Sequence, residues 1–432
     1  MSERHPLHAG FAKVNITPDQ PQGLTLYGMP RQWPGARGVL DPLHARAMYL
    51  ACGPDKFLLV VNDNVHPRTT FPHHFRAIDH LARYGSIPRD NIWIVSNHCH
   101  SAVGDESRSN PHLRKVANRY QLALVDKLKR VGEQAIDNAV PAKLGHGQGP
   151  VEGVGTSRRV KLNDGFVITG WGDGPSPPPG TRIVGRGPHD PDVGVVMLRT
   201  LDDQPLGALV SYNSHVHAQP IVYFTAELAG GVCRALERRH PGLTAMHTHG
   251  AAGDIALSEN LTPQPDDEHE AARAHRRDIR RMSRRIAERI EQLEADMRFA
   301  HRGRLACGET SAPIWNSARG KADEPIWAVA FNDLALLGEA QEMFVAYILA
   351  LRAQSPFRST FCLGLRHAVE QGPNYYFPTD YALEEGGYES KRWYEPGAND
   401  RMVDTAATLL RKLHRKVNGG TATRKRAAAP AR

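Results

Sequence analysis

The stretch NIWIVSNHCHS, from Asn91 to Ser101, joins an apolar run to two closely spaced histidines. The run Ile92–Val95 has the branched and aromatic side chains of a short buried β-strand. His98 and His100 follow it closely, with Cys99 between them. Imidazole is a common metal ligand, and a loop that leaves a strand holds such a side chain rigidly. The stretch therefore predicts a strand and, just past its carboxyl end, a candidate metal site.

The same pattern recurs twice later in the chain. His215 and His217 follow the apolar run in ALVSYNSHVHAQ, and His247 and His249 follow the run in LTAMHTHG. Parallel strands would bring all three pairs to one edge, where open α/β sheets bind ligands. The chain has 22 histidines, so a single pair can arise by chance, but three in one context favour metal binding. Alternate residues of an extended segment point to opposite sides. Unless the strand has already ended, each pair therefore gives one ligand and one supporting or catalytic group.

Strand-like and helix-like segments alternate along the chain, which is typical of an α/β fold. Hairpin turns are predicted at residues 53–55, 202–203 and 332–333, and a long charged helix at about 266–296. We expect a mixed central sheet covered by helices, with the metal site at the carboxyl ends of its strands. The Gly- and Pro-rich stretch 170–192 is predicted to be an irregular loop that covers the site.

The composition of the chain argues against a membrane-inserted protein. No apolar run reaches the ~18 residues that span a bilayer, and the first residues lack the apolar core of a signal peptide. We therefore expect no stable membrane insertion.

The five scattered cysteines suggest a reducing cytoplasm. One domain is expected over residues 1–416, followed by a disordered basic tail at 417–432.

The formal charge of +8 raises the question of nucleic-acid binding. The basic residues of the long charged helix alternate with acidic ones, which predicts a solvated helix with i,i+4 ion pairs. Aromatic residues make up only 7% of the chain, fewer than a surface that stacks bases would favour. We therefore expect no nucleic-acid partner.

The chain contains several motifs in a definite order, namely FAKVNITP, SNHCHSAVGD, YNSHVHA with TAELAGG, HGAAGDIA, LGEAQEMFV and YYFPTDYALEEGGYE. These motifs and their order resemble those of the neutral/alkaline ceramidase family. The resemblance extends from about Phe11 to Glu389 and implies the catalytic domain of that family. The immunoglobulin-like domain that ends the long ceramidases is expected to be absent. By this resemblance, residues 1–416 are expected to be a metal-dependent hydrolase domain.

The resemblance also implies a ligand set for one Zn²⁺ ion per chain. Two histidines, a carboxylate and a phenolic oxygen would leave the ion open to water or substrate. Glu339 is the alternative carboxylate, and Tyr375 is the alternative tyrosine. The implied metal ligands are His98, His215, Glu342 and Tyr376.

Three further positions correspond to catalytic groups of the family. His100 matches its second histidine, which would stabilise a developing oxyanion. Tyr388 matches a tyrosine twelve residues beyond the ligand tyrosine, and this interval is kept here. Arg158 lies near the family's substrate-side arginine, with Arg159 as the alternative.

One position departs from the family pattern. The long ceramidases carry G-D-x-S-P, whereas this chain has Gly253-Asp254-Ile255-Ala256-Leu257, so Ala256 replaces the serine beside the zinc. Ser258, two residues on, cannot be assumed to substitute for it. This change argues against cleavage that depends on that serine and favours direct attack by a zinc-bound hydroxide.

The sequence therefore predicts a zinc-dependent hydrolase that cleaves the amide (C–N) bond of a small soluble substrate. The alternatives are an ester or lactone hydrolase, a ceramidase-like protein that acts on N-acyl lipids, and a non-catalytic metal-binding protein. A homo-oligomer is compatible with the sequence.

Overall fold

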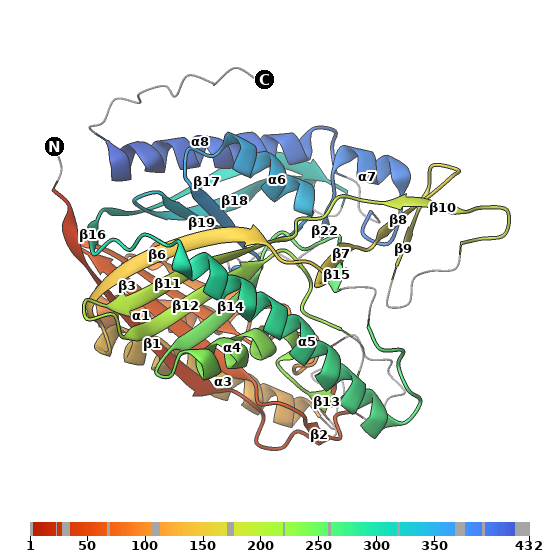
Figure 1. Cartoon of the computed structure of the whole chain (residues 1–432), viewed down its shortest axis with the longest axis horizontal. Coiled ribbons are helices and arrows are strands. Elements are labelled where there is room, and N and C mark those ends of the chain that lie inside the picture. Colours follow the sequence, from red (N-terminus) through yellow and green to blue (C-terminus); the bar gives the residue numbers. More distant parts are fainter. Residues whose placement is uncertain are drawn as a thin grey trace.

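The computed structural model has four layers, in the order helices, sheet, sheet, helices (Figure 1). Three buried apolar clusters fill the spaces between successive layers. The structure describes residues 3–22, 24–27, 35–66, 70–104, 113–170, 177–218, 221–257, 261–317, 320–367, 376–390 and 394–419.

The larger sheet has nine strands. The pairs β12/β14 and β4/β5 are parallel, and the other neighbours are antiparallel, so the predicted mixed sheet is confirmed. The strand order is β14 (Thr244–His249), β12 (Pro205–Tyr212), β11 (Asp192–Thr200), β6 (Val140–Pro150), β1 (His5–Asn15), β3 (His44–Cys52), β4 (Asp55–Asn62) and β5 (Ile92–Ser96), with β16 (Arg302–Gly303) paired to β1.

Helices cover one face of this sheet (Figure 1). They present apolar stripes at helical spacing; in α1, for example, Ala77, Ile78 and Leu81 are buried. The long charged helix predicted at 266–296 is confirmed as α5. The helices of this layer are α1 (His74–Gly85), α3 (Arg114–Asp137), α4 (Glu227–Arg239) and α5 (Glu268–Ala295).

A second sheet, rather than helices, covers the other face. In β18, Val329 and Phe331 pack toward the nine-stranded sheet, while Ala328 and Ala330 pack toward α6 and α8. Side chains alternate between the two faces of a strand, and here both faces are buried. The second sheet contains β17 (Leu305–Asn316), β18 (Gly320–Phe331), β19 (Leu334–Glu339) and β21 (Ser359–Leu363); α6 (Val345–Gln354) and α8 (Ala398–Asn418) cover it.

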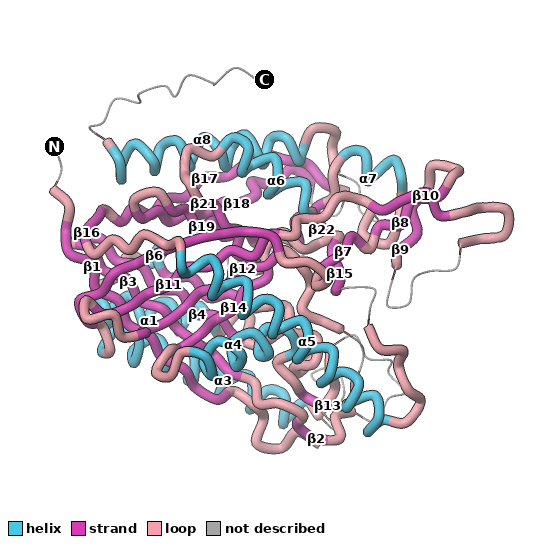
Figure 2. The backbone as a smooth tube through the Cα atoms, in the orientation of Figure 1, coloured by secondary structure: helices cyan, strands magenta, loops and turns pink. Residues whose placement is uncertain are grey.

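Short elements gather at one end of the layers (Figure 2). One of them, β10, lies inside the stretch 170–192 and pairs with β8, so the prediction of an irregular loop is wrong for this part. Residues 171–176 of that stretch lie outside the described residues. The short elements at this end are β7 (Gly155–Ser157) with β15 (Ile255–Leu257), β8 (Arg159–Leu162) with β9 (Val167–Thr169) and β10 (Ile183–Arg186), β20 (Glu342–Met343) with β22 (Tyr376–Phe377), β2 (Gly38–Val39) with β13 (Tyr223–Phe224), and α7 (Asp380–Glu385). The short helix η2 (Arg89–Asn91) instead directly precedes β5.

The larger sheet curls strongly. β14 stands at one end of its strand order, yet its residues come within 8 Å (Cα–Cα) of residues in β3 and β4. Successive strands of a sheet are rotated by roughly 20–25° relative to one another, and this twist accumulates. The carboxyl ends of β5, β12 and β14 therefore approach each other, although β12 and β5 are connected through antiparallel strands.

The last described element of the chain is the carboxyl-terminal helix α8. α8 extends to Asn418, so the predicted start of a disordered tail at residue 417 is wrong. Residues 420–432 lie outside the described residues. None of the described helices is long and apolar enough to cross a bilayer.

Candidate metal centre

The turn after β5 places both histidines of NIWIVSNHCHS at one site. β5 ends at Ser96, and His98 has a positive φ of 63°. Hydrogen bonds from the backbone N–H groups of Asn97 and Cys99 to the carbonyls of Asn62 and Asn64 fix this turn. Since the strand has ended, the alternation of side chains no longer applies. The ring centroids of His98 and His100 are only 4.8 Å apart.

The ring of His98 is oriented by the backbone. Its Nδ1 donates to the carbonyl oxygen of Val65 at 2.8 Å. This bond fixes the tautomer and leaves the Nε2 lone pair available to a ligand. Nε2 lies 3.5 Å from Oε2 of Glu342.

His215, after β12, is oriented in the same way. Its Nδ1 lies 2.8 Å from the carbonyl oxygens of both Ala252 and Ile255. Its Nε2 is also 3.5 Å from Oε2 of Glu342. Burial, together with nearby Arg158, lowers the pKa of His215 to about 4. The ring is therefore neutral at physiological pH, as a metal ligand must be.

Glu342 completes an electron-rich centre. Its Oε2 is buried and has no hydrogen-bond partner among the described residues. Burial acts to raise the pKa of Glu342, but His98 and His215 outweigh it and lower that pKa to about 2. Two imidazole nitrogens and a carboxylate oxygen thus face one another, and Nη1 of Arg158 lies 3.4 Å from Nε2 of His215. This donor set fits a divalent transition metal ion.

His100 lies at the edge of the same centre. Its Nε2 is 3.3 Å from Nε2 of His98, and ligand atoms of His98, His100 and His215 all lie within 4.8 Å of one another. Burial, followed by the neighbouring His98, lowers the pKa of His100 well below its usual value. A neutral His100 can accept or donate a proton beside the centre, and it is also within reach of a metal ion.

Short strands place the two remaining predicted ligands together. Glu342 in β20 is the register partner of Tyr376 in β22. Glu342 lies in β20 and not in a helix, since α6 begins three residues later at Val345. Glu339 is buried in β19 and accepts a hydrogen bond from the hydroxyl of Tyr347, so it lies outside the histidine cluster. Tyr375 lies outside the described residues.

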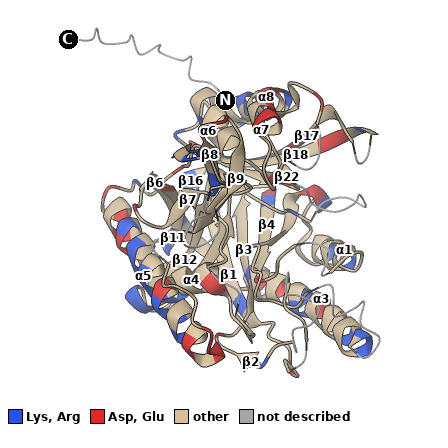
Figure 3. Cartoon of the chain, turned by 90° about the vertical axis from the view of Figure 1, so that its right-hand side faces the viewer, with Lys and Arg blue, Asp and Glu red and all other residues tan. Residues whose placement is uncertain are grey.

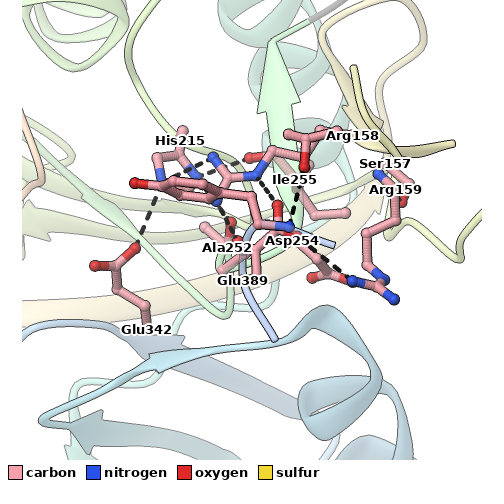
Figure 4. A network of polar contacts seen from close by, with 12 residues as sticks. Ser157, Arg158, Arg159, His215, Ala252, Asp254, Ile255, Glu342 and Glu389 are labelled. Carbon is pink, nitrogen blue, oxygen red and sulfur yellow. Dashed lines mark hydrogen bonds and ion pairs between the residues drawn. The ribbon is translucent and has the colours of Figure 1, made fainter. Parts of the chain in front are cut away.

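Arg158, not Arg159, reaches the centre (Figure 4). Nη1 of Arg158 is 3.4 Å from Nε2 of His215, and its guanidinium carbon is 5.2 Å from the ring centroid of Tyr376. Its Nε donates to Glu389 at 2.7 Å, and both side chains of this ion pair are fully buried. Arg159 extends away from Glu342 in the view and pairs with Glu385.

Tyr388 lies at the exposed rim. Its ring meets that of Tyr376 edge-on at 5.7 Å, and 43% of the residue is exposed. Its backbone N–H donates to the hydroxyl of Thr169 in β9. The structure thus brings all seven predicted site residues to one region, with Tyr388 nearest to solvent.

Glu227 is a supporting residue that sequence reasoning missed. It starts α4, is completely buried and has a positive φ of 46°. Its carboxylate accepts from the backbone N–H of His100, the hydroxyl of Ser101 and Nδ1 of His217. The motif TAELAGG contains this residue, but nothing in its spacing indicates a link to His100, 127 positions away.

The segment that departs from the family pattern borders the centre. Asp254 and Ile255 accept backbone hydrogen bonds from Arg158 and His215. Ala256 follows in β15, opposite Thr156 of β7. Ser258 lies outside the described residues.

Comparison of the sequence with protein-family models gives no match, and comparison with curated proteins gives none. Solved structures do match. The neutral ceramidase from Pseudomonas aeruginosa aligns with a TM-score of 0.69 at 16% identity, over 99% of this chain and 77% of that chain. A ceramidase complexed with C2 aligns with a TM-score of 0.69 at 15% identity, over 94% of this chain and 76% of that chain. The fold implied by the sequence resemblance is therefore confirmed, and this chain has a neutral ceramidase-like fold.

Proposed function

We propose that this protein is a metal-dependent hydrolase that cleaves a C–N amide bond. The observation that carries the proposal is the convergence of His98 Nε2 and His215 Nε2 on the unpartnered Oε2 of Glu342, in a ceramidase-like fold. His98, His215, Glu342 and Tyr376 would hold one Zn²⁺ ion per chain. When bound, such an ion would polarise the scissile carbonyl and acidify a coordinated water.

The chain's own groups supply the remaining chemistry. His100, neutral and next to His98, is placed to hold a proton at Nε2 as the tetrahedral centre forms and to return it to the leaving amine. Arg158 is held by Glu389 and by the carbonyl of Gly253, so its positive charge is fixed beside His215 before substrate arrives. Such preorganised charge stabilises a developing oxyanion. Tyr388 would donate to the same oxyanion from the rim.

Ala256 supports hydrolysis without a serine nucleophile. Its methyl side chain cannot donate a proton or form an acyl intermediate. Cleavage would then proceed by direct attack of water, with no covalent enzyme intermediate. The proposed substrate is a small soluble N-acyl amide.

An exposed apolar surface favours a second candidate, an N-acyl lipid. Phe166, just before β9, and Ile183 and Val184, in β10, are 62%, 46% and 54% exposed. They lie on the β8–β9–β10 sheet, at the end away from Thr169, whose hydroxyl accepts from Tyr388. Exposed apolar side chains of this kind suit an apolar acyl chain. A series of N-acyl substrates with increasing acyl chain length distinguishes the two candidates. If the natural substrate is a lipid, kcat/KM should rise steadily with chain length, and if it is a small soluble amide, kcat/KM should not.

The remaining features belong to the same proposal. All five cysteines are free, which supports a cytoplasmic location. Residues up to the end of α8 would form the single hydrolase domain.

Matched amide and ester substrates with the same acyl group test the proposed function. We expect purified protein to contain about one zinc per chain and to hydrolyse the amide with kcat/KM at least equal to that for the ester. Protein that contains metal but hydrolyses only esters or lactones would replace the amidase proposal with the ester or lactone alternative. Protein without metal would contradict the metal-dependent mechanism.

A further inference from the structure

A groove of about 980 Å³ lies between α4 and α5, away from the histidine cluster. Eight of its fifteen described lining residues are arginines, three from α4 and five from α5. Asp41 and Asp278 are the acidic residues among these fifteen. We call this the arginine groove. Figure 3 shows the basic residues gathered along the middle of α5.

The two acidic residues are already engaged. Asp278 accepts from the backbone N–H and the hydroxyl of Thr262 at 2.7 and 3.1 Å, and it also pairs with Arg281. Asp41 accepts from the hydroxyl of Thr225 and lies 3.4 Å from Arg234. Neither carboxylate is left to neutralise the rest of the groove.

The expected i,i+4 pairing fails in the middle of α5. Between residues 271 and 287 the helix has seven arginines and one acid, because its glutamates occupy the two ends. Arg276, Arg277, Arg280 and Arg238 have no acidic side chain within 4.0 Å in the part of the chain that the structure describes. Arg276 and Arg280 are one turn apart, where like charges destabilise a helix. A bound anion would remove this repulsion.

A polar group is also left without a partner in the wall of the groove. Ser283 is 2% exposed, and its hydroxyl has no hydrogen-bond partner among the described residues. It faces α4 at Gly231, where a Cβ would come within 2.3 Å of the hydroxyl oxygen. A buried hydroxyl without a partner is costly and is often satisfied by a ligand or a water.

We propose that the arginine groove binds an oligophosphate, a compound with two or more phosphate groups. Arginine presents paired N–H donors that match phosphate oxygens, and several phosphates are needed to engage arginines from both helices. The volume is in the range of small-molecule sites. None of the described lining residues is aromatic, so the groove offers no surface for stacking bases.

Calorimetric titration with inorganic tripolyphosphate at physiological ionic strength tests the proposal. We expect saturable 1:1 binding that weakens about tenfold or more in Arg277→Glu/Arg280→Glu, since each arginine supplies a charge-assisted hydrogen bond. The matched control is Arg83→Glu/Arg411→Glu, which changes net charge equally at exposed positions on α1 and α8. Unfolding midpoints check that both variants are folded. Absence of binding, or equal weakening in the two variants, would overturn the proposal.

Two further titrations identify the source of the phosphates. Vesicles with and without phosphatidylinositol bisphosphate test a lipid headgroup. Binding that tripolyphosphate displaces and that Arg277→Glu/Arg280→Glu weakens supports the groove with a lipid source, and binding of free tripolyphosphate alone supports a soluble one. A short DNA duplex that binds more tightly than tripolyphosphate, with the same dependence on Arg277 and Arg280, would overturn the proposal in favour of a nucleic-acid surface.

Discussion

Within the described part of the chain, the histidine cluster and the arginine groove differ in the kind of charge that is left without a partner. The cluster leaves a carboxylate oxygen unpartnered, and the groove leaves several arginines without an acidic partner. In the cluster, the Nε2 atoms of His98 and His215 face Oε2 of Glu342, which has no hydrogen-bond partner among the described residues. In the groove, four arginines have no acidic side chain within 4.0 Å among the described residues, namely Arg238, Arg276, Arg277 and Arg280. Backbone hydrogen bonds fix the two imidazoles of the cluster, whereas most groove arginines extend into solvent. The comparison teaches that the charge left unpaired in each region indicates the charge of its ligand. The negative carboxylate of the cluster favours a cation, and the positive arginines of the groove favour an anion.

Removing a ligand from the cluster should have the largest effect. We expect His98→Ala and His215→Ala to lose the bound metal and nearly all activity, because each removes one of three converging atoms. Elemental analysis and turnover measure both effects. The control is His301→Ala, at an exposed position. Unchanged metal content in these two variants would contradict the inference that the histidine cluster binds a cation.

The second prediction contrasts a buried arginine with an exposed one. Arg158→Met leaves Glu389 without its shortest partner in a fully buried ion pair. We expect the free energy of unfolding to fall by about 3 kcal/mol, since the buried Glu389 would keep only its longer, 3.4 Å contact with Arg159. Arg277→Met in the groove should change it by no more than ~0.5 kcal/mol, because Arg277 has no acidic side chain within 4.0 Å among the described residues. Urea unfolding of both variants measures the difference, and equal effects would contradict it.

The third prediction concerns proton transfer and oxyanion stabilisation. His100→Ala and Tyr388→Phe should each lower kcat by ~10²–10³ with little change in KM, because these groups act mainly on the transition state. Steady-state kinetics test this. We also expect His100→Ala to retain its metal. Loss of metal in this variant would make His100 a ligand instead of a catalytic group.

The smallest expected effect is on the pH dependence of stability. Burial raises the pKa of Asp254 to about 7. The unfolded chain releases this proton near pH 4, while the folded protein retains it up to about pH 7. The contribution of Asp254 to stability therefore falls as pH rises through that interval, by at most ~1.4 kcal/mol per pH unit. Asp254→Asn keeps an acceptor for the N–H of Val345 and should flatten the slope. Chemical denaturation between pH 5 and 7 measures it.

The sequence predicted local features of the fold well. The turns at Asp203 and Asn332 were found because aspartate and asparagine tolerate the positive φ that both adopt. The strand Ile92–Ser96 and its histidines were found because apolar runs and imidazoles are local signals. The second sheet was missed because strands buried on both faces lack the alternation that distinguishes them from helices.

The site shows a similar limit. The resemblance to a family placed Glu342 and Tyr376 together, but no local signal did, because their two-residue strands are 34 positions apart. Glu227 was missed because its contacts with His100 depend on how α4 packs under the turn after β5. The arginine groove was missed because the long charged helix was judged by its overall composition, whereas its acids lie at the ends and its arginines in the middle.

Helix α4 imposes a constraint on how this chain can vary in length. Glu227 at its first residue contacts His100, while Gly231, Arg234 and Arg238 further along line the groove. An α-helix advances about 1.5 Å and turns about 100° per residue. A single insertion within its 13 residues would therefore turn the arginines out of the groove or detach Glu227 from His100. Homologous chains that keep both regions should show gaps in the neighbouring loops and none within this helix.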